Sequence, residues 1–202
     1  MDAEYWNKKY DTEGLVYTGN VNMFVKEYLE PLEAGTAIDL AGGEGRNAVW
    51  LAERGWKVED IDFSPIAIAK FLKFAEERGV ADLCLGNVAS GADFESKLAP
   101  VDLGLIGYLQ IEKSALQQAI HRLISNIKPG GVLFGVWHAG ENQNIGYGGP
   151  QDPAVLPTVQ SLTEILERQP IEIEVLTNRD GLVQTKDGFK PSTVVVLKAT
   201  RR

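Results

Sequence analysis

The feature that most constrains the fold of this chain is residues 36–47, which read TAIDLAGGEGRN. A short apolar run ends at Gly42, Gly43 and Gly45, and a helical pattern begins at about Arg46. Glycines between a strand and a helix let backbone N–H groups approach a ligand at the positive helix N-terminus. The spacing differs from the G-x-G-x-x-G of dinucleotide sites. The stretch predicts a ligand-binding turn at the end of a first strand.

A second strand pattern, residues 57–62, ends at Asp62, 17 residues beyond Gly45. In α/β folds a carboxylate at this place accepts hydrogen bonds from ribose hydroxyls. The glycine turn and the acid together predict a nucleoside-type cofactor.

The two segments DLAGGEGRN (39–47) and VEDIDFSP (58–65) resemble motifs I and II of class I S-adenosylmethionine-dependent methyltransferases. The resemblance is closest to small tellurite-resistance-type (TehB-like) methyltransferase domain proteins, and it runs from Trp6 to the final strand. The family's first motif reads roughly Asp-Leu-Gly-Cys-Gly-x-Gly-Arg-Asn, so Ala41 stands where a glycine is usual. If this position needs a positive φ, alanine is strained there; if it does not, the methyl group crowds the methionine part of the cofactor.

Strand and helix patterns alternate along the chain. Helices are predicted at 46–54, 65–79, 113–128 and 159–168, and further strands at 83–86, 101–106 and 132–137. Residues 171–177 and 192–200 are predicted to pair as an antiparallel hairpin through a turn at 178–181. The expected fold is an α/β, Rossmann-like doubly wound three-layer sandwich, with a mostly parallel seven-stranded sheet. The resemblance implies that its last strand is antiparallel.

The length of 202 residues predicts one domain, 1–202. Residues 1–32 are predicted to form an N-terminal cap and a helix. The aromatic start either closes over the site as a flap or packs one helical face against the body. Residues 139–157 form a long loop over the site, which is either a lid or a rigid connection braced by prolines.

A net charge of −8 disfavours nucleic-acid partners, which need a concentrated basic surface. One cysteine, an acidic and polar start, and the lack of a long apolar run predict a cytoplasmic protein with no membrane contact. The two histidines and the cysteine lack ligand spacing, so no metal is expected. The tetrapeptide that marks amino-methylating nucleic-acid enzymes (Asn-Pro-Pro-Tyr-like) is absent too. These features favour a small-molecule acceptor; a monomer and a homodimer stay equally open.

The cofactor-binding residues follow from the motifs and the resemblance. Asp62 is expected on the ribose, Phe63 beside the adenine, and Asn87 where the family usually has an aspartate that accepts from the adenine amino group. Arg46 either pairs with the cofactor's carboxylate or faces solvent. Asp39 either orders the glycine turn or contacts the ligand. The full set is Asp39, Ala41, Gly42, Gly43, Gly45, Arg46, Asp62, Phe63, Asn87 and Val88.

The acceptor is expected at the carboxyl ends of the fourth and fifth strands, because ligands gather at the switch point of an open sheet. His138 and Tyr108 are the candidate catalytic residues, with His138 either a general base or hydrogen-bonded scaffolding. The candidate substrate contacts are Trp6, Tyr10, Tyr17, Gln110 and Tyr147.

These features predict an S-adenosylmethionine-dependent methyltransferase that transfers a methyl group to a small molecule by in-line displacement. Two alternatives remain. One is a module that binds S-adenosylmethionine or S-adenosylhomocysteine without turnover, and the other is a nicotinamide-dependent oxidoreductase.

Overall fold

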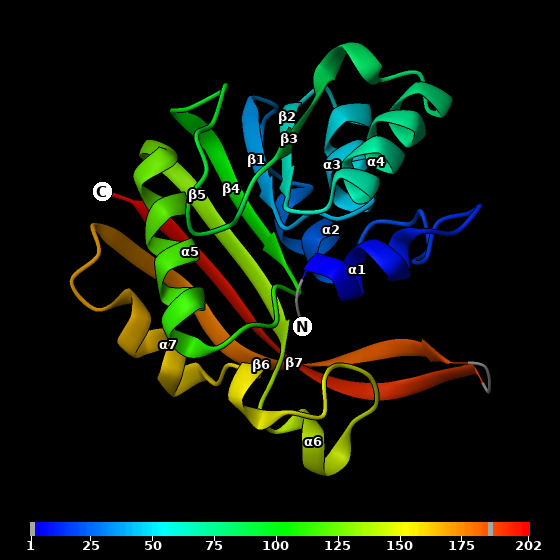
Figure 1. Cartoon of the computed structure of the whole chain (residues 1–202). Helices are drawn as coiled ribbons and strands as arrows, with labels where there is room; N and C mark the ends of the chain where they lie inside the picture. Colours follow the sequence, from blue (N-terminus) through cyan, green and yellow to red (C-terminus); the bar gives the residue numbers. More distant parts are fainter. Residues whose placement is uncertain (1–2, 186–187) are drawn as a thin grey trace.

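The computed structural model describes residues 3–185 and 188–202. Its strands form one seven-stranded sheet in the order β3-β2-β1-β4-β5-β7-β6 (Figure 1). The strands are β1 Thr36–Leu40, β2 Lys57–Asp62, β3 Cys84–Val88, β4 Val101–Gly107, β5 Ile127–His138, β6 Ile171–Thr185 and β7 Gly188–Arg201. The α-helices are α1 Ala3–Tyr10, α2 Met23–Leu29, α3 Arg46–Glu53, α4 Pro65–Glu77, α5 Lys113–Asn126, α6 Asn142–Ile145 and α7 Val159–Leu166.

The sheet confirms the predicted fold class. Strand β1 lies between β2 and β4 and is parallel to both, and β3 and β5 extend the parallel part on either side. Strand β7 is inserted between β5 and β6 and is antiparallel to both. The carboxyl ends of β1, β2 and β4 therefore meet at one edge, where the glycine turn lies.

Helices cover both faces of the sheet, as in a three-layer sandwich (Figure 1). One core cluster joins α2, α3 and α4 to the sheet through residues such as Phe24, Ala48 and Phe71. A second cluster joins α5 and α7 to the opposite face through Leu123 and Ile165. None of the helices in the described ranges is both long and apolar enough to cross a lipid bilayer.

Side-chain caps set where several helices begin. The Ser64 hydroxyl accepts from the Ala67 amide at the start of α4, and Pro65 occupies the first helical position. Asn22 caps α2 in the same way. These caps fix the first residues of α2 and α4.

The predicted turn at 178–181 is wrong. These residues lie inside β6, where Asn178 pairs with Val195 and Gly181 pairs with Ser192. The continuous ladder with β7 outweighs the local turn preference of an Asn-Arg-Asp-Gly sequence. The paired strands consequently extend beyond the rest of the sheet and pass beneath α1 in the view of Figure 1.

Candidate functional site

The glycine turn after β1 has three residues with positive φ: Ala41 (58°), Gly43 (64°) and Gly45 (78°). Of the two alternatives for Ala41, the structure has the strained one, because this alanine occupies a left-handed conformation. Gly45 precedes α3, and a Cβ at this position would lie 2.1 Å from Phe71 Cδ2. Only glycine fits at that point of close packing between α3 and α4.

Asp62 is tied to the glycine turn by its carboxylate. The Gly43 amide donates to Asp62 Oδ2 at 3.2 Å, and the Ser64 amide donates to Oδ1 at 2.8 Å. Burial raises the pKa of Asp62, while the two backbone hydrogen bonds lower it. Because each carboxylate oxygen has two lone pairs, both oxygens can still accept from a diol.

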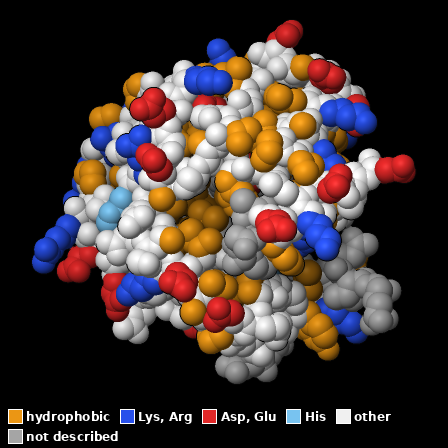
Figure 2. Space-filling model, viewed as in Figure 1, with side chains coloured by type: hydrophobic (Ala, Val, Ile, Leu, Met, Phe, Trp, Pro, Cys, Tyr) orange, Lys and Arg blue, Asp and Glu red, His pale blue; other side chains and the backbone are white. Residues whose placement is uncertain are grey.

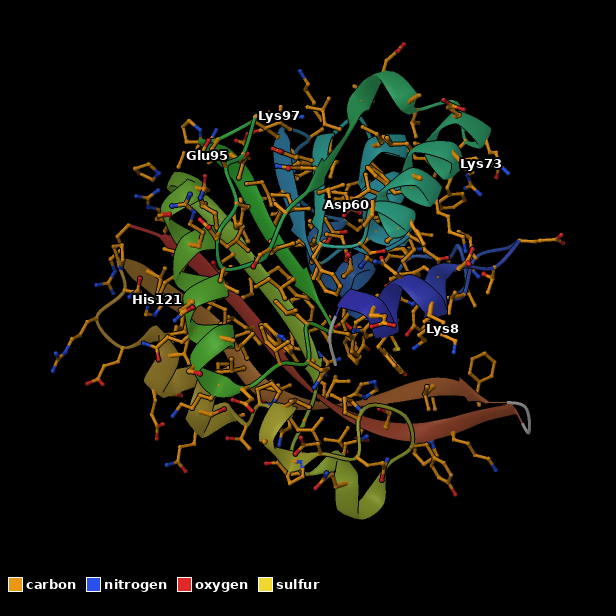
Figure 3. All side chains as sticks on the ribbon, in the orientation of Figure 1. Lys8, Asp60, Lys73, Glu95, Lys97 and His121 are labelled. Carbon is orange, nitrogen blue, oxygen red and sulfur yellow. The ribbon has the colours of Figure 1, made fainter. Side chains whose placement is uncertain are left out.

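Two further acids lie beneath the turn. Asp39 and Asp60 are fully buried, and no described residue donates a hydrogen bond to either carboxyl group. Figure 3 labels Asp60 in the interior, beside β2. Sequence reasoning assigned Asp39 to the cofactor site but gave Asp60 no role, because an acid inside a strand carries no signal of what surrounds it.

Asn87 at the end of β3 is held by its amide nitrogen. That nitrogen donates to Glu59 Oε1 at 2.8 Å and to the Glu95 carbonyl at 2.9 Å. The Asn87 side-chain oxygen is therefore the atom that would accept from an adenine amino group. Nearby, Phe63 is half-buried and Val88 is 53% exposed.

The aromatic N-terminal segment lies over the glycine turn. The Tyr10 hydroxyl is 2.8 Å from where a Cβ on Gly43 would lie, and the Trp6 and Tyr10 rings stack with centroids 5.6 Å apart. Asn7 Oδ1 accepts from the Ser64 hydroxyl at 2.5 Å. Helix α1 thus both packs on the body and covers the predicted cofactor residues.

An ion pair, which sequence reasoning missed, fastens this segment to the turn. Glu44, inside the glycine turn, accepts from the Val16 and Tyr17 backbone amides and from Lys70 Nζ at 3.0 Å. Lys70 also donates to the Gly14 carbonyl at 2.6 Å. The Tyr17 side chain itself is exposed and accepts from Lys9 Nζ at 2.6 Å. The only available signal was a charged residue within the glycine motif.

Tyr108 and His138 form the other half of the site. Their rings lie 4.8 Å apart, and Tyr108 has a positive φ of 62°, a strained conformation for an aromatic residue. The Tyr108 hydroxyl accepts from Asn22 Nδ2 at 3.1 Å, and Arg46 Cζ lies 5.9 Å from the ring centroid. Arg46 therefore lies between the glycine turn and the tyrosine.

His138 is half-buried, and burial lowers its pKa to about 4, so the imidazole is neutral at pH 7. Its Nδ1 lies 3.3 Å from Ser192 Oγ on β7. Gly149, with φ 78°, lies against the ring, and a Cβ there would be 2.8 Å from His138 Cγ. The neutral imidazole has a lone pair that can accept a proton, but its lowered pKa makes it a weaker base than an exposed histidine.

The loop after β5 is braced by side chains. Asn142 donates to the Tyr147 and Gly148 carbonyls and accepts from the Thr193 amide. Gln110 donates to the Val155 carbonyl at 2.9 Å and accepts from the His138 amide at 2.8 Å. Tyr147 is 50% exposed. Of the two predicted alternatives, the contacts favour a braced connection, with the Gln110 amide used in bracing and Tyr147 left at the surface.

Within residues 3–185 and 188–202, no three histidine, cysteine or acidic side chains are grouped in a way that could hold a metal ion.

Comparisons with known proteins find similarity in the first part of the chain. Residues 1–89 match the thiopurine S-methyltransferase (TPMT) family model. The chain is 35% identical over 97 residues to the tRNA 5-carboxymethoxyuridine methyltransferase of Escherichia coli (strain K12), an alignment that covers 48% of this chain and 37% of that protein. The chain thus spans little more than a third of the length of this curated relative.

Solved structures share the whole fold. TehB from Haemophilus influenzae superposes with a TM-score of 0.72 at 16% identity, over 99% of this chain and 67% of that chain. The N-methyltransferase NodS from Bradyrhizobium japonicum WM9, in complex with S-adenosyl-L-homocysteine, superposes with a TM-score of 0.73 at 12% identity. The superposition covers 98% of this chain and 97% of that chain.

The chain therefore has the fold of class I S-adenosylmethionine-dependent methyltransferases. Its predicted resemblance to that class, including the TehB-like proteins, is confirmed. The family-model match is confined to its first 89 residues.

Proposed function

We propose that this protein is an S-adenosylmethionine-dependent methyltransferase. The observation that carries the proposal is the hydrogen bond from the Gly43 amide to Asp62, which joins the glycine turn to the acid at the end of β2. The residues suit the cofactor: Asp62 for the ribose, the Asn87 oxygen for the adenine, and the cluster of acids below the turn for a cationic ligand. The family match and the fold shared with a neighbour that binds S-adenosyl-L-homocysteine support this assignment.

The cofactor supplies an electrophilic methyl group that is transferred by in-line displacement, so the protein must chiefly align the acceptor and exclude water. We assign alignment to Tyr108 and proton acceptance to His138. The ring contact at 4.8 Å and the neutral imidazole support these roles. Arg46 is proposed to hold the cofactor's carboxylate.

For the acceptor we propose a small molecule. The net charge of −8 and the interspersed acidic and basic side chains on the face in Figure 2 support this choice. A second acceptor, a modified base in tRNA, is favoured by one observation: the E. coli relative is named for methylating 5-carboxymethoxyuridine in tRNA.

Isothermal titration with S-adenosylmethionine, S-adenosylhomocysteine and NAD tests the cofactor. We expect binding of the first two and none of NAD, with binding lost in Asp62→Ala. Binding of NAD alone would favour the nicotinamide-dependent oxidoreductase, and binding retained by Asp62→Ala would overturn the ribose assignment.

Release of S-adenosylhomocysteine, measured with a panel of small acceptors and with total tRNA, then identifies the acceptor class. Turnover with a small molecule supports the proposal. Turnover with tRNA alone, weakened steeply by added salt, would replace the small molecule with a nucleic-acid acceptor. Tight cofactor binding without turnover on either panel would favour the non-catalytic binding module.

A further inference from the structure

Asp60 is one of the acids beneath the glycine turn, and its surroundings are unusual. It is register-paired with Asp39 on the neighbouring parallel strand, so the two side chains project from the same face of the sheet. Both side chains are fully buried, and none of their four carboxyl oxygens accepts a hydrogen bond from the described residues.

Other buried acids in this protein are well supplied with donors. Glu59, the neighbour of Asp60 in β2, accepts from the Asn87 amide, the Ser96 hydroxyl and the Lys97 backbone N–H. Glu44 has an ion pair and two backbone donors. Because a buried unpaired polar group is costly, the lack of donors around Asp39 and Asp60 marks a place where an outside group completes the site.

The pair lies directly against the glycine turn. Asp60 Oδ2 is 2.4 Å from where a Cβ on Gly42 would lie, so the carboxyl group fills the space beneath that glycine. A negative charge on the two carboxyl groups would therefore act on a ligand bound at the turn, because only the Gly42 backbone separates them.

Two adjacent carboxyl groups in this setting cannot both ionise without a counter-charge. Burial raises the pKa of Asp39 and of Asp60, and the charge of Asp62 raises both further. The charge of Arg46, at the start of α3, and the backbone amide of Ala48 lower the pKa of Asp39.

The remaining titratable neighbours are Tyr10 of α1 and Cys84 of β3. Burial raises the pKa of both groups and the charge of Asp60 adds to the rise, so they stay neutral and supply no positive charge. The pair of carboxyl groups thus retains a proton at neutral pH when no ligand is bound.

We propose that Asp39 and Asp60 form a proton-sharing carboxyl pair beneath the glycine turn, which gives up its proton when the turn binds an organic cation. The inference rests on the proposed function, whose cofactor carries an ammonium and a sulfonium group. The step breaks one carboxyl O–H bond, the proton passes to the solvent buffer, and no electrons are transferred.

Titration calorimetry in phosphate and Tris at pH 7 counts the protons, because the two buffers differ in ionisation enthalpy. With S-adenosylhomocysteine we expect release of about one proton per site from the wild type and almost none from Asp60→Asn. Adenosine has the same base and ribose without the cation, and its binding should release no proton. A parallel titration with S-adenosylmethionine distinguishes the two cationic groups. If it releases as many protons as S-adenosylhomocysteine, the ammonium group causes the release; if it releases more, the sulfonium group contributes as well.

Asp102→Asn is the matched control. Asp102 is an acid at the amino end of β4 that accepts from the Thr36 amide, away from the glycine turn, and its removal should leave the proton count unchanged. Wild-type binding without proton release, or the same release from Asp60→Asn, would overturn the inference. Failure of every ligand to bind would instead count against the proposed function. Asp39→Asn serves as a second variant, which should also lose the release, and circular dichroism verifies that each variant is folded.

Discussion

Ala41 stands where the resembling family usually has glycine. Its φ of 58° is unfavourable for alanine and so lowers the stability of the folded protein. An alanine in the left-handed conformation destabilises the folded protein by about 1 kcal/mol. Replacing it with glycine recovers only part of this free energy, because glycine loses more conformational entropy on folding. We therefore expect Ala41→Gly to raise the melting temperature by roughly 1–3 °C and to leave cofactor affinity intact or improved. Differential scanning calorimetry and titration measure the two effects.

The control for that change is Gly45→Ala, which introduces a methyl group 2.1 Å from Phe71 Cδ2 at a φ of 78°. It should destabilise the protein by about 1–3 kcal/mol. If Ala41→Gly lowered stability as well, the backbone strain assigned to position 41 would be wrong.

His138 should not titrate in the physiological range. Burial lowers its pKa to about 4, so the neutral form persists from pH 5.5 upward and is lost only near pH 4. Nuclear magnetic resonance can follow its imidazole directly, because the chain has two histidines and His121→Gln removes the other signal. We expect a flat chemical shift from pH 5.5 to 8, and a midpoint near 6.5 would contradict the burial argument.

A catalytic role for His138 is tested by His138→Gln once an acceptor is known. A general base contributes about 10²–10⁴-fold, so kcat should fall within that range while cofactor affinity stays unchanged. Unchanged turnover would leave His138 as scaffolding for Ser192 and the loop after β5.

At the scale of elements, the Glu44–Lys70 pair decides how firmly residues 12–17 are held over the glycine turn. Lys70→Met leaves the buried Glu44 carboxylate without its counter-ion and should cost about 2–4 kcal/mol. Hydrogen exchange at the Val16 and Tyr17 amides should speed up in the same variant, because Glu44 is their acceptor.

Lys73→Met is the comparison. Lys73 lies one turn along α4 in an exposed pair with Glu77, and Figure 3 places it at the outer surface. Its removal should change stability by less than about 0.5 kcal/mol and leave exchange at residues 16–17 unaltered. Equal effects from the two variants would show that the pair does not fasten the segment.

The sequence predicted the order of strands and helices because period and capping are local properties. Ser64 and Pro65 predicted the start of α4. The glycine turn and Asp62 predicted the ends of two strands, which the structure brings together. Three features could not be foreseen, because each depends on a partner distant in the chain. They are the ladder that holds residues 178–181 in a strand, the hydrogen bonds that the amides of residues 16–17 donate to Glu44, and the lack of donors around Asp60.

At the scale of the whole molecule, the buried acids shape the pH dependence of stability. Because the pKa of Asp39 is raised to about 7 and that of Asp60 is also raised, the folded protein binds more protons than the unfolded chain between pH 4 and 7. Their contribution to the free energy of unfolding therefore falls as pH rises through that window. His138 acts in the opposite direction between pH 4 and 6.5, because its pKa is lowered.

Comparing Asp60→Asn with the wild type isolates the acid contribution. We expect the variant to be more stable at pH 7 by on the order of 1–3 kcal/mol, with the difference disappearing near pH 4. Urea unfolding at both pH values measures it. A variant less stable than the wild type at pH 7 would mean that Asp60 is satisfied by a donor in the folded protein.

The insertion of β7 between β5 and β6 also has a consequence for how the protein is made on the ribosome. The glycine turn, Asp62 and Tyr108 all precede β5, so this part of the molecule emerges first. Strand β5, which ends at His138, waits for residues 188–201 to complete its pairing, a delay of roughly 3–10 s at ordinary rates of synthesis. Every residue predicted to bind the cofactor is therefore synthesised before the strand that completes the sheet beside His138.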